Sequence, residues 1–157
     1  MMNPPEGTWI PKWNEETLFD VWKKICQFDS VFMDDDLKNS AVFLNKLLPP
    51  TVTLMTDGGM MWLQNIRPGL RGEVHFTFWD KKLSSRLELI QNCLIWGFLS
   101  FDLQRIETYV ANYAYSIQRF IEKKLNFKKE GTLRNRVFHR NELIDVHVYS
   151  ILKEEVL

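Results

Sequence analysis

Two titratable side chains, Glu73 and His75, stand two positions apart in the run GEVHFTFWD at residues 72–80. Polar and apolar residues alternate along this run, which predicts a strand with both side chains on one face. Either group can accept a proton near neutral pH in suitable surroundings, so each is a candidate general base. The structural alternative is that Glu73 pairs with a neighbour and His75 is a hydrogen-bonded histidine in a half-buried sheet.

The segment that follows combines cations with hydroxyl groups. Lys81, Lys82 and Arg86 can form charge-assisted hydrogen bonds with a phosphate, and Ser84 and Ser85 can donate their hydroxyls. The segment contains no glycine, the residue that lets a backbone approach phosphate most closely. It therefore indicates either a phosphate site built from side chains or a solvated basic turn in which Ser84 caps a helix.

A scaffold of strands and helices must position these residues, and apolar periodicity predicts one. Helices are expected after Asn14, from Asp34–Asp36 to the break at Pro49-Pro50, near residues 84–100, and near residues 117–125. Strands are expected at residues 8–13, 51–56, 60–66, 72–80, 105–111, 127–140 and 143–152. The Asp57-Gly58-Gly59 sequence favours a tight hairpin. Periodicity alone thus indicates an α/β protein with hairpins.

Composition narrows the class of protein. A chain of 157 residues with 45% hydrophobic content corresponds to one domain with a real core. Its 20 basic and 20 acidic residues cancel, so charge gives no indication of a nucleic acid or membrane partner. The two cysteines lack the spacing of a disulfide framework or a metal site, and no long apolar run is present. A cytoplasmic protein without a metal is therefore expected.

The C-terminal half carries an ordered series of residues in the stretch RIETYVAN…S…EKKLNFKKEGTLRN…NELIDVHVYSILKEE. The series resembles the C-terminal half of GNAT-type N-acetyltransferases, most closely the RimJ/RimL-like branch. The matching residues are Arg105, Ile106, Asn112, Ser116, Glu122, Lys123, Phe127, Glu130, Gly131, Arg134, Asp145, Tyr149, Leu152 and Glu155.

This resemblance implies a fold and a cofactor site. The fold is a single α/β domain over residues 1–157, with an irregular segment at residues 1–7 and a twisted mixed sheet covered by helices on both faces. Acetyl-CoA would lie along the strand at residues 72–80, against Phe76 and Phe78, with its pyrophosphate at the next helix start. Asn112 and Ser116 occupy family positions that contact the cofactor.

The chain departs from the family pattern at three places. Asn126 replaces a glycine after the helix at residues 117–125, and asparagine also tolerates a left-handed backbone. The pyrophosphate-binding loop is degenerate, since Ser84 and Arg86 replace its glycines. The family's tyrosine general acid is absent, so Tyr113 and Tyr115 are substitutes by proximity only.

Charge is unevenly distributed along the chain. Residues 119–140 hold eight Lys or Arg, and residues 15–36 hold seven acids. These runs are either solvated faces or a basic rim for coenzyme A opposite an acidic surface for a cationic acceptor.

Two functions follow from the resemblance. The first is an acetyl-CoA-dependent N-acetyltransferase that acts on a primary amine of a protein or small molecule, as a monomer, homodimer or subunit. Glu73 or His75 would be its base and Tyr115 its candidate acid. The alternative is an inactive GNAT-fold binding or structural subunit. An enzyme requires an open gap between residues 72–80 and 105–111, whereas bulky side chains there could close the gap in the alternative.

Overall fold

The structure of the protein is a computed structural model that describes residues 1–27, 34–80 and 83–157. Its strands are β1 (Val52–Thr56), β2 (Gly59–Arg67), β3 (Arg71–Phe78), β4 (Arg105–Ala111), β5 (Lys128–His139) and β6 (Glu142–Leu152). Its α-helices are α1 (Glu15–Ile25), α2 (Ser40–Leu47), α3 (Leu87–Phe101) and α4 (Tyr115–Lys123). Short 3-10 turns are η2 (Asp35–Lys38), η3 (Leu83–Arg86) and η4 (Lys153–Glu155).

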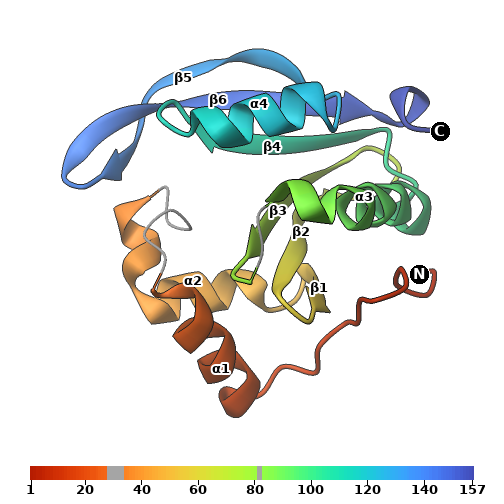
Figure 1. Ribbon diagram of the computed structural model, residues 1–157, viewed down its shortest axis with the longest axis horizontal. Coiled ribbons are helices and arrows are strands. Elements are labelled where there is room, and N and C mark those ends of the chain that lie inside the picture. Colours follow the sequence, from red (N-terminus) through yellow and green to blue (C-terminus); the bar gives the residue numbers. More distant parts are fainter. Residues whose placement is uncertain (28–33, 81–82) are drawn as a thin grey trace.

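The six strands form one mixed sheet in the order β1-β2-β3-β4-β6-β5 (Figure 1). Every neighbouring pair is antiparallel except β3 and β4, which are parallel. A parallel pair needs a crossover connection, and α3 provides it. The long β5–β6 hairpin forms the far side of the sheet.

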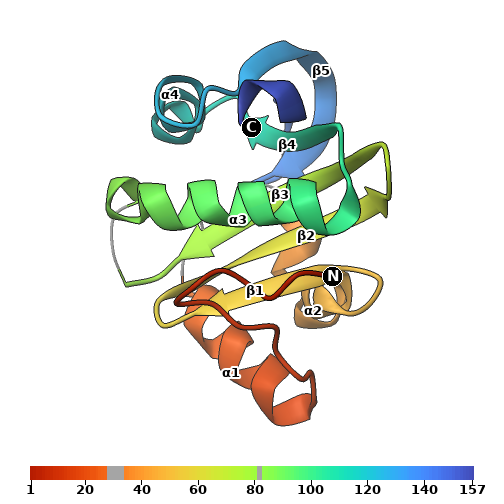
Figure 2. The same ribbon diagram turned by 90° about the vertical axis from the view of Figure 1, so that its right-hand side faces the viewer.

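Strand alternation gives the sheet two apolar faces. Leu63 and Val74 pack with α3 and α4 in one cluster, while Met60 and Trp62 pack with α1 and α2 in another. Because neighbouring residues of β2 belong to different clusters, the two helix pairs cover opposite faces. Figure 2 shows α3 crossing β2 and β3. The expected mixed sheet with helices on both faces is confirmed.

The prediction of a strand at residues 8–13 is wrong. Only Trp9 pairs with the sheet, through two hydrogen bonds of 3.0 and 2.8 Å to the backbone of Met55. Pro11 lacks a backbone N–H and so cannot continue a ladder of hydrogen bonds.

Polar side chains end or begin the helices as the sequence predicts. The Asn14 side chain accepts a hydrogen bond from the Thr17 N–H at 2.9 Å, and Asp34 caps η2 in the same way. Asn126 is left-handed at φ 61°, and the next N–H, of Phe127, donates to the Ile121 carbonyl. Among the described residues, no helix is long and apolar enough to cross a membrane.

Candidate active site

The parallel strands β3 and β4 part soon after they meet. They pair only from Arg71–Glu73 to Arg105–Glu107, although both strands continue for several residues. From there on they enclose a cavity of about 600 Å³ that α2 and α4 also line. Its lining residues are Leu37, Phe43, Lys46, Trp62, Gln64, His75, Phe76, Thr77, Phe78, Leu83, Thr108, Tyr109, Val110, Ala111, Tyr113, Ala114, Tyr115, Ser116, Ile117 and Ile121. The expected gap is therefore open.

Aromatic side chains line this gap and do not close it. Phe76 and Phe78 lie on the α3 side, where they pack against the apolar cluster with their ring centroids 6.4 Å apart. Tyr109 and Tyr113 form part of the opposite wall. Because strand side chains point to the faces of the sheet, they leave the space between the strands free.

Glu73 and His75 share one face of β3, as alternation predicts, and they are in contact. The Glu73 Oε1 atom lies 2.5 Å from His75 Nε2, and Glu73 also accepts from Gln64 and Asn65, each at 2.8 Å. Burial opposes ionisation of Glu73, but these hydrogen bonds outweigh it and lower the pKa of the carboxyl group. A carboxylate held this way is a weak base.

His75 lines the cavity, whereas Glu73 is not among its lining residues. The Glu73 carboxylate can only accept, so the close contact places a proton on His75 Nε2; the lone pair of the neutral ring is then on Nδ1. The ring of His75 stacks on Trp62 with centroids 5.2 Å apart and planes 17° apart. This packing fixes the orientation of the imidazole.

Arg86 lies beyond the end of β3, where the resemblance places a pyrophosphate. Its Nη2 atom donates to both oxygens of Asp80 at 2.7 Å, and its guanidinium lies 5.4 Å from the centroid of Phe78. Its Nε atom is buried and has no hydrogen-bond partner in the part of the chain that the structure describes.

The other predicted phosphate ligands differ in their placement. Lys81 and Lys82 lie outside the described residues. Ser84 and Ser85 are exposed in η3 and are not among the lining residues of the cavity. The predicted helix cap at Ser84 is wrong, because the 3-10 turn comes first and α3 begins after Arg86.

The segment from β4 to α4 places Ser116 and Tyr115 in the cavity wall but not Asn112. The Asn112 backbone instead joins two elements: its N–H donates to the Asp145 carbonyl, and its carbonyl accepts from Gln118. Tyr115 is 75% exposed at the start of α4. It therefore belongs to the rim of the cavity.

Charged residues at the start of β4 form a network that the sequence did not indicate. Glu107 accepts hydrogen bonds from Arg71 at 3.2 Å and Arg105 at 2.8 Å. Arg105 also donates to Glu130, which in turn accepts from the Ser150 hydroxyl. The network joins β3, β4, β5 and β6 at the point where β3 and β4 begin to part.

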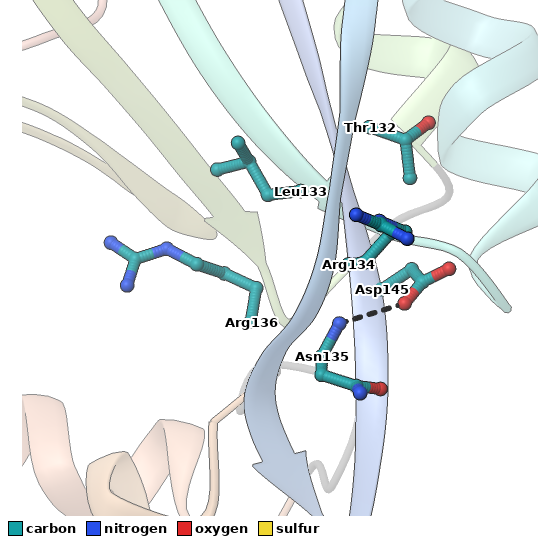
Figure 3. Close-up of a pocket in the computed structure, with 6 residues that line it drawn as sticks. All are labelled: Thr132, Leu133, Arg134, Asn135, Arg136 and Asp145. Atoms are coloured by element: carbon teal, nitrogen blue, oxygen red, sulfur yellow. Dashed lines mark hydrogen bonds between the residues drawn. The ribbon is translucent and has the colours of Figure 1, made fainter.

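A second hollow lies on β5, where the ladder with β6 is irregular between Leu133 and Val137. Its lining residues are Thr132, Leu133, Arg134, Asn135, Arg136 and Asp145. The Asn135 N–H donates to Asp145 Oδ1 at 2.8 Å, and Arg134 and Arg136 leave the strand toward opposite sides (Figure 3). Within the described residues, no group of three or more His, Cys, Asp or Glu is arranged to hold a metal ion.

Comparisons with known proteins give one relative in sequence and many in structure. No family model matches the chain. The chain is 36% identical over 92 residues to the uncharacterized N-acetyltransferase p20 of Bacillus licheniformis, a match that covers 59% of this chain. It spans about half (50%) of that curated relative.

Solved acetyltransferases have the same fold along nearly the whole chain. A GNAT-family acetyltransferase from Bacillus anthracis has a TM-score of 0.67 at 22% identity and covers 99% of this chain and 100% of its own. A spermidine N-acetyltransferase from Vibrio cholerae, in complex with CoA and spermine, has a TM-score of 0.76 at 15% identity, with coverage of 97% and 99%. The predicted fold is confirmed, while the RimJ/RimL-like branch stays a prediction.

Proposed function

Because the chain has the GNAT acetyltransferase fold and resembles this family in sequence, we propose that it transfers an acetyl group from acetyl-CoA to a primary amine. The observation that carries the proposal is the early parting of β3 and β4 around a cavity of about 600 Å³. A closed sheet would bury more apolar surface at about 25 cal/mol per Å². An open gap in the middle of a sheet is expected where a ligand occupies it.

The gap suits an extended ligand that behaves as an added strand. Beyond Glu73, the backbone of β3 no longer pairs with β4, so a pantetheine arm can take the place of the missing strand. Arg86, whose Nε–H has no partner among the described residues, follows the outer end of β3, where a pyrophosphate would lie. Ser116, on the wall contributed by α4, is a further contact for the cofactor.

His75 is the proposed general base. Its Nδ1 lone pair takes a proton from the acceptor amine, and the Glu73 carboxylate stabilises the resulting imidazolium through Nε2. As that proton leaves, the amine nitrogen would bond to the thioester carbonyl carbon, and the carbon–sulfur bond would break to release the thiolate of coenzyme A. Tyr115, on the rim, is the candidate donor of a proton to that thiolate. Alignment of the amine and the thioester supplies much of the rate.

A binding or structural role without catalysis receives no support from the cavity. That alternative predicted strands paired along their full length or aromatic side chains within the gap. Pairing of β3 with β4 instead stops at Glu73 and Glu107, and Phe76 and Phe78 lie to one side of the gap.

Calorimetric titration with acetyl-CoA tests the proposal. We expect binding by the unaltered protein and weaker binding by Arg86→Met. Asp80→Asn should bind more tightly, since it removes the carboxylate that occupies Arg86 Nη2. Lys12→Met, a substitution of an exposed residue far along the chain, serves as the control. No heat and no thermal shift with millimolar acetyl-CoA would refute the transferase.

A further inference from the structure

The cavity has a distinctive charge. Within the described chain, its lining contains no Asp or Glu, and Lys46 on α2 is the one lining side chain that always carries a charge. A polyamine needs carboxylates to replace the water around its several ammonium groups. This cavity offers none of them.

The acids of residues 15–36 were interpreted above either as a solvated face or as a surface for a cationic acceptor. Three of them form contacts within the folded chain. Asp20 pairs with Lys23 at 2.9 Å, and Asp34 accepts from the backbone of η2. Asp35 accepts from the N–H groups of Arg140 and Asn141, each at 2.9 Å, and so holds the tip of the β5–β6 hairpin against η2. Among the described residues, no acid of this run lines the cavity, so an acidic surface for a cationic acceptor stays a prediction.

Trp62 lines the cavity and carries a buried donor without a partner among the described residues. Its side chain lines the cavity and is only 8% exposed, yet its indole N–H makes no hydrogen bond with any described residue. A buried N–H without a partner is costly, and such groups in native structures call for an acceptor from a ligand or water. An oxygen atom of a bound molecule would satisfy it.

Lys46 adds a positive charge on the same side. It is three residues from Phe43 on α2, and the Phe43 ring contacts Trp62 edge to face with centroids 6.0 Å apart. The Lys46 ammonium forms no ion pair with any described residue and can turn toward an anion at Trp62. Phe43 and Trp62 themselves offer an apolar surface.

A second cation, Arg136, lies on β5. Arg136 extends from β5 on the side away from Arg134 and Asp145 (Figure 3). Burial, reinforced by Glu107 and Glu73, raises the pKa of Tyr109, and the positive charge of Arg136 acts against this rise. Tyr109 lines the cavity, whereas Arg136 lines the second hollow on β5.

We propose that the acceptor is a small, apolar amine with a carboxylate next to its amino group, as in an α-amino acid, and that Trp62 Nε1 and Lys46 bind this carboxylate. The rings of His75 and Trp62 stack with their centroids 5.2 Å apart, so the base and the donor belong to adjacent residues of the cavity wall. The inference rests on the proposed function, since it names the acceptor of the same transfer. It excludes polyamines as acceptors.

Calorimetry with four probes tests the inference, both with and without coenzyme A. The probes are phenylalanine, phenylalanine amide, phenethylamine and spermine. Phenylalanine should bind most tightly, because it alone combines the apolar body, the amine and the carboxylate. Trp62→Phe keeps the aromatic ring but removes the donor, and should weaken phenylalanine binding about tenfold. Phenethylamine binding should not change.

Lys46→Met gives an independent variant on the surface of α2, and Lys12→Met is its matched control. Lys46→Met should weaken phenylalanine about threefold and leave phenethylamine unchanged, as expected for one exposed charge. The inference is overturned if spermine binds more tightly than phenylalanine, or if phenethylamine or the amide binds equally well. It is also overturned if no probe binds, or if neither variant has an effect. Titration of the same samples with acetyl-CoA tests the proposed function separately. A failure of the transferase proposal can therefore be distinguished from a failure of the acceptor inference.

Discussion

Replacement of Glu73 by Gln tests both the base and the packing around it. Glu73 has a side chain only 12% exposed and accepts from His75, Gln64 and Asn65. Gln keeps the size and one acceptor oxygen, but it removes the charge and turns one acceptor into a donor. A hydrogen bond to a charged group contributes about 1.5–3 kcal/mol, so Glu73→Gln should lower the free energy of unfolding by about 2 kcal/mol at pH 7.

The pH dependence of this loss follows from the pKa of Glu73. Burial raises this pKa, but the hydrogen bonds from His75, Asn65 and Gln64 prevail and lower it below its unfolded value. The ionised carboxyl group therefore stabilises the fold above the unfolded pKa, and that contribution is lost as the pH falls through the folded pKa. The difference between Glu73→Gln and the unaltered protein should be full at pH 7 and should close in acid.

Urea unfolding followed by tryptophan fluorescence measures this difference from pH 7 to pH 3. Glu142→Gln, at an exposed position at the start of β6, is the control and should change little at any pH. The reasoning is refuted if Glu73→Gln matches the unaltered protein at pH 7, or if its deficit persists unchanged in acid. In the same variant, His75 loses the partner that orients its ring, so kcat should also fall while the Kd of acetyl-CoA stays constant.

Three further predictions concern the cavity. His75→Ala should lower kcat about 10²- to 10⁴-fold with little change in acetyl-CoA affinity, and an unchanged kcat in steady-state assays removes His75 as the base. Tyr115→Phe should lower kcat and leave the Kd of acetyl-CoA unchanged; equal turnover would exclude its hydroxyl as the acid. Asp35→Asn should raise the KM of the acceptor severalfold. The N–H groups of Asn141 and Arg140 lower the pKa of Asp35 by binding its charged form, and this contact holds the hairpin tip against η2, whose Leu37 lines the cavity. No shift in KM would separate the hairpin tip from acceptor binding.

The parts of the fold predicted correctly are those with a local cause. Asn14 satisfies N–H groups of its own helix, and the Asp57-Gly58 pair turns the chain between β1 and β2. Asn126 adopts the left-handed backbone that its short polar side chain permits. Each of these outcomes depends on a few adjacent residues, so the sequence alone is sufficient.

The errors occur where a contact with a distant part of the chain, or a competing turn, determines the local structure. The helix expected from Asp34–Asp36 begins only at Ser40, because the η2 turn comes first, and α2 buries Phe43 and Leu47. The turn between β5 and β6 lies at Arg140-Asn141, both left-handed, one residue before the expected position. Asp35, from a different part of the chain, accepts from both of these residues.

In the candidate site, too, the features with a local cause were predicted and those that depend on distant contacts were not. Alternation along β3 placed Glu73 and His75 on one face, but the stacking of Trp62 on His75 depends on the register between β2 and β3. Nothing within β2 alone distinguishes Trp62 from an ordinary core residue. Lys46 and Gln64 were missed for the same reason, since α2 and β2 contact β3 only in the folded chain.

The glycine-free segment shows why a missing motif does not settle a function. Glycines would let backbone N–H groups surround a phosphate, whereas here a 3-10 turn that ends at Arg86 precedes α3, which begins at Leu87. Asp80 holds one nitrogen of Arg86, and the buried Nε is left without a partner among the described residues. A guanidinium oriented by a carboxylate but still able to donate suits an anion that arrives from outside. The contacts of Arg86 are therefore the basis for the prediction that this segment, although it lacks glycine, binds a phosphate.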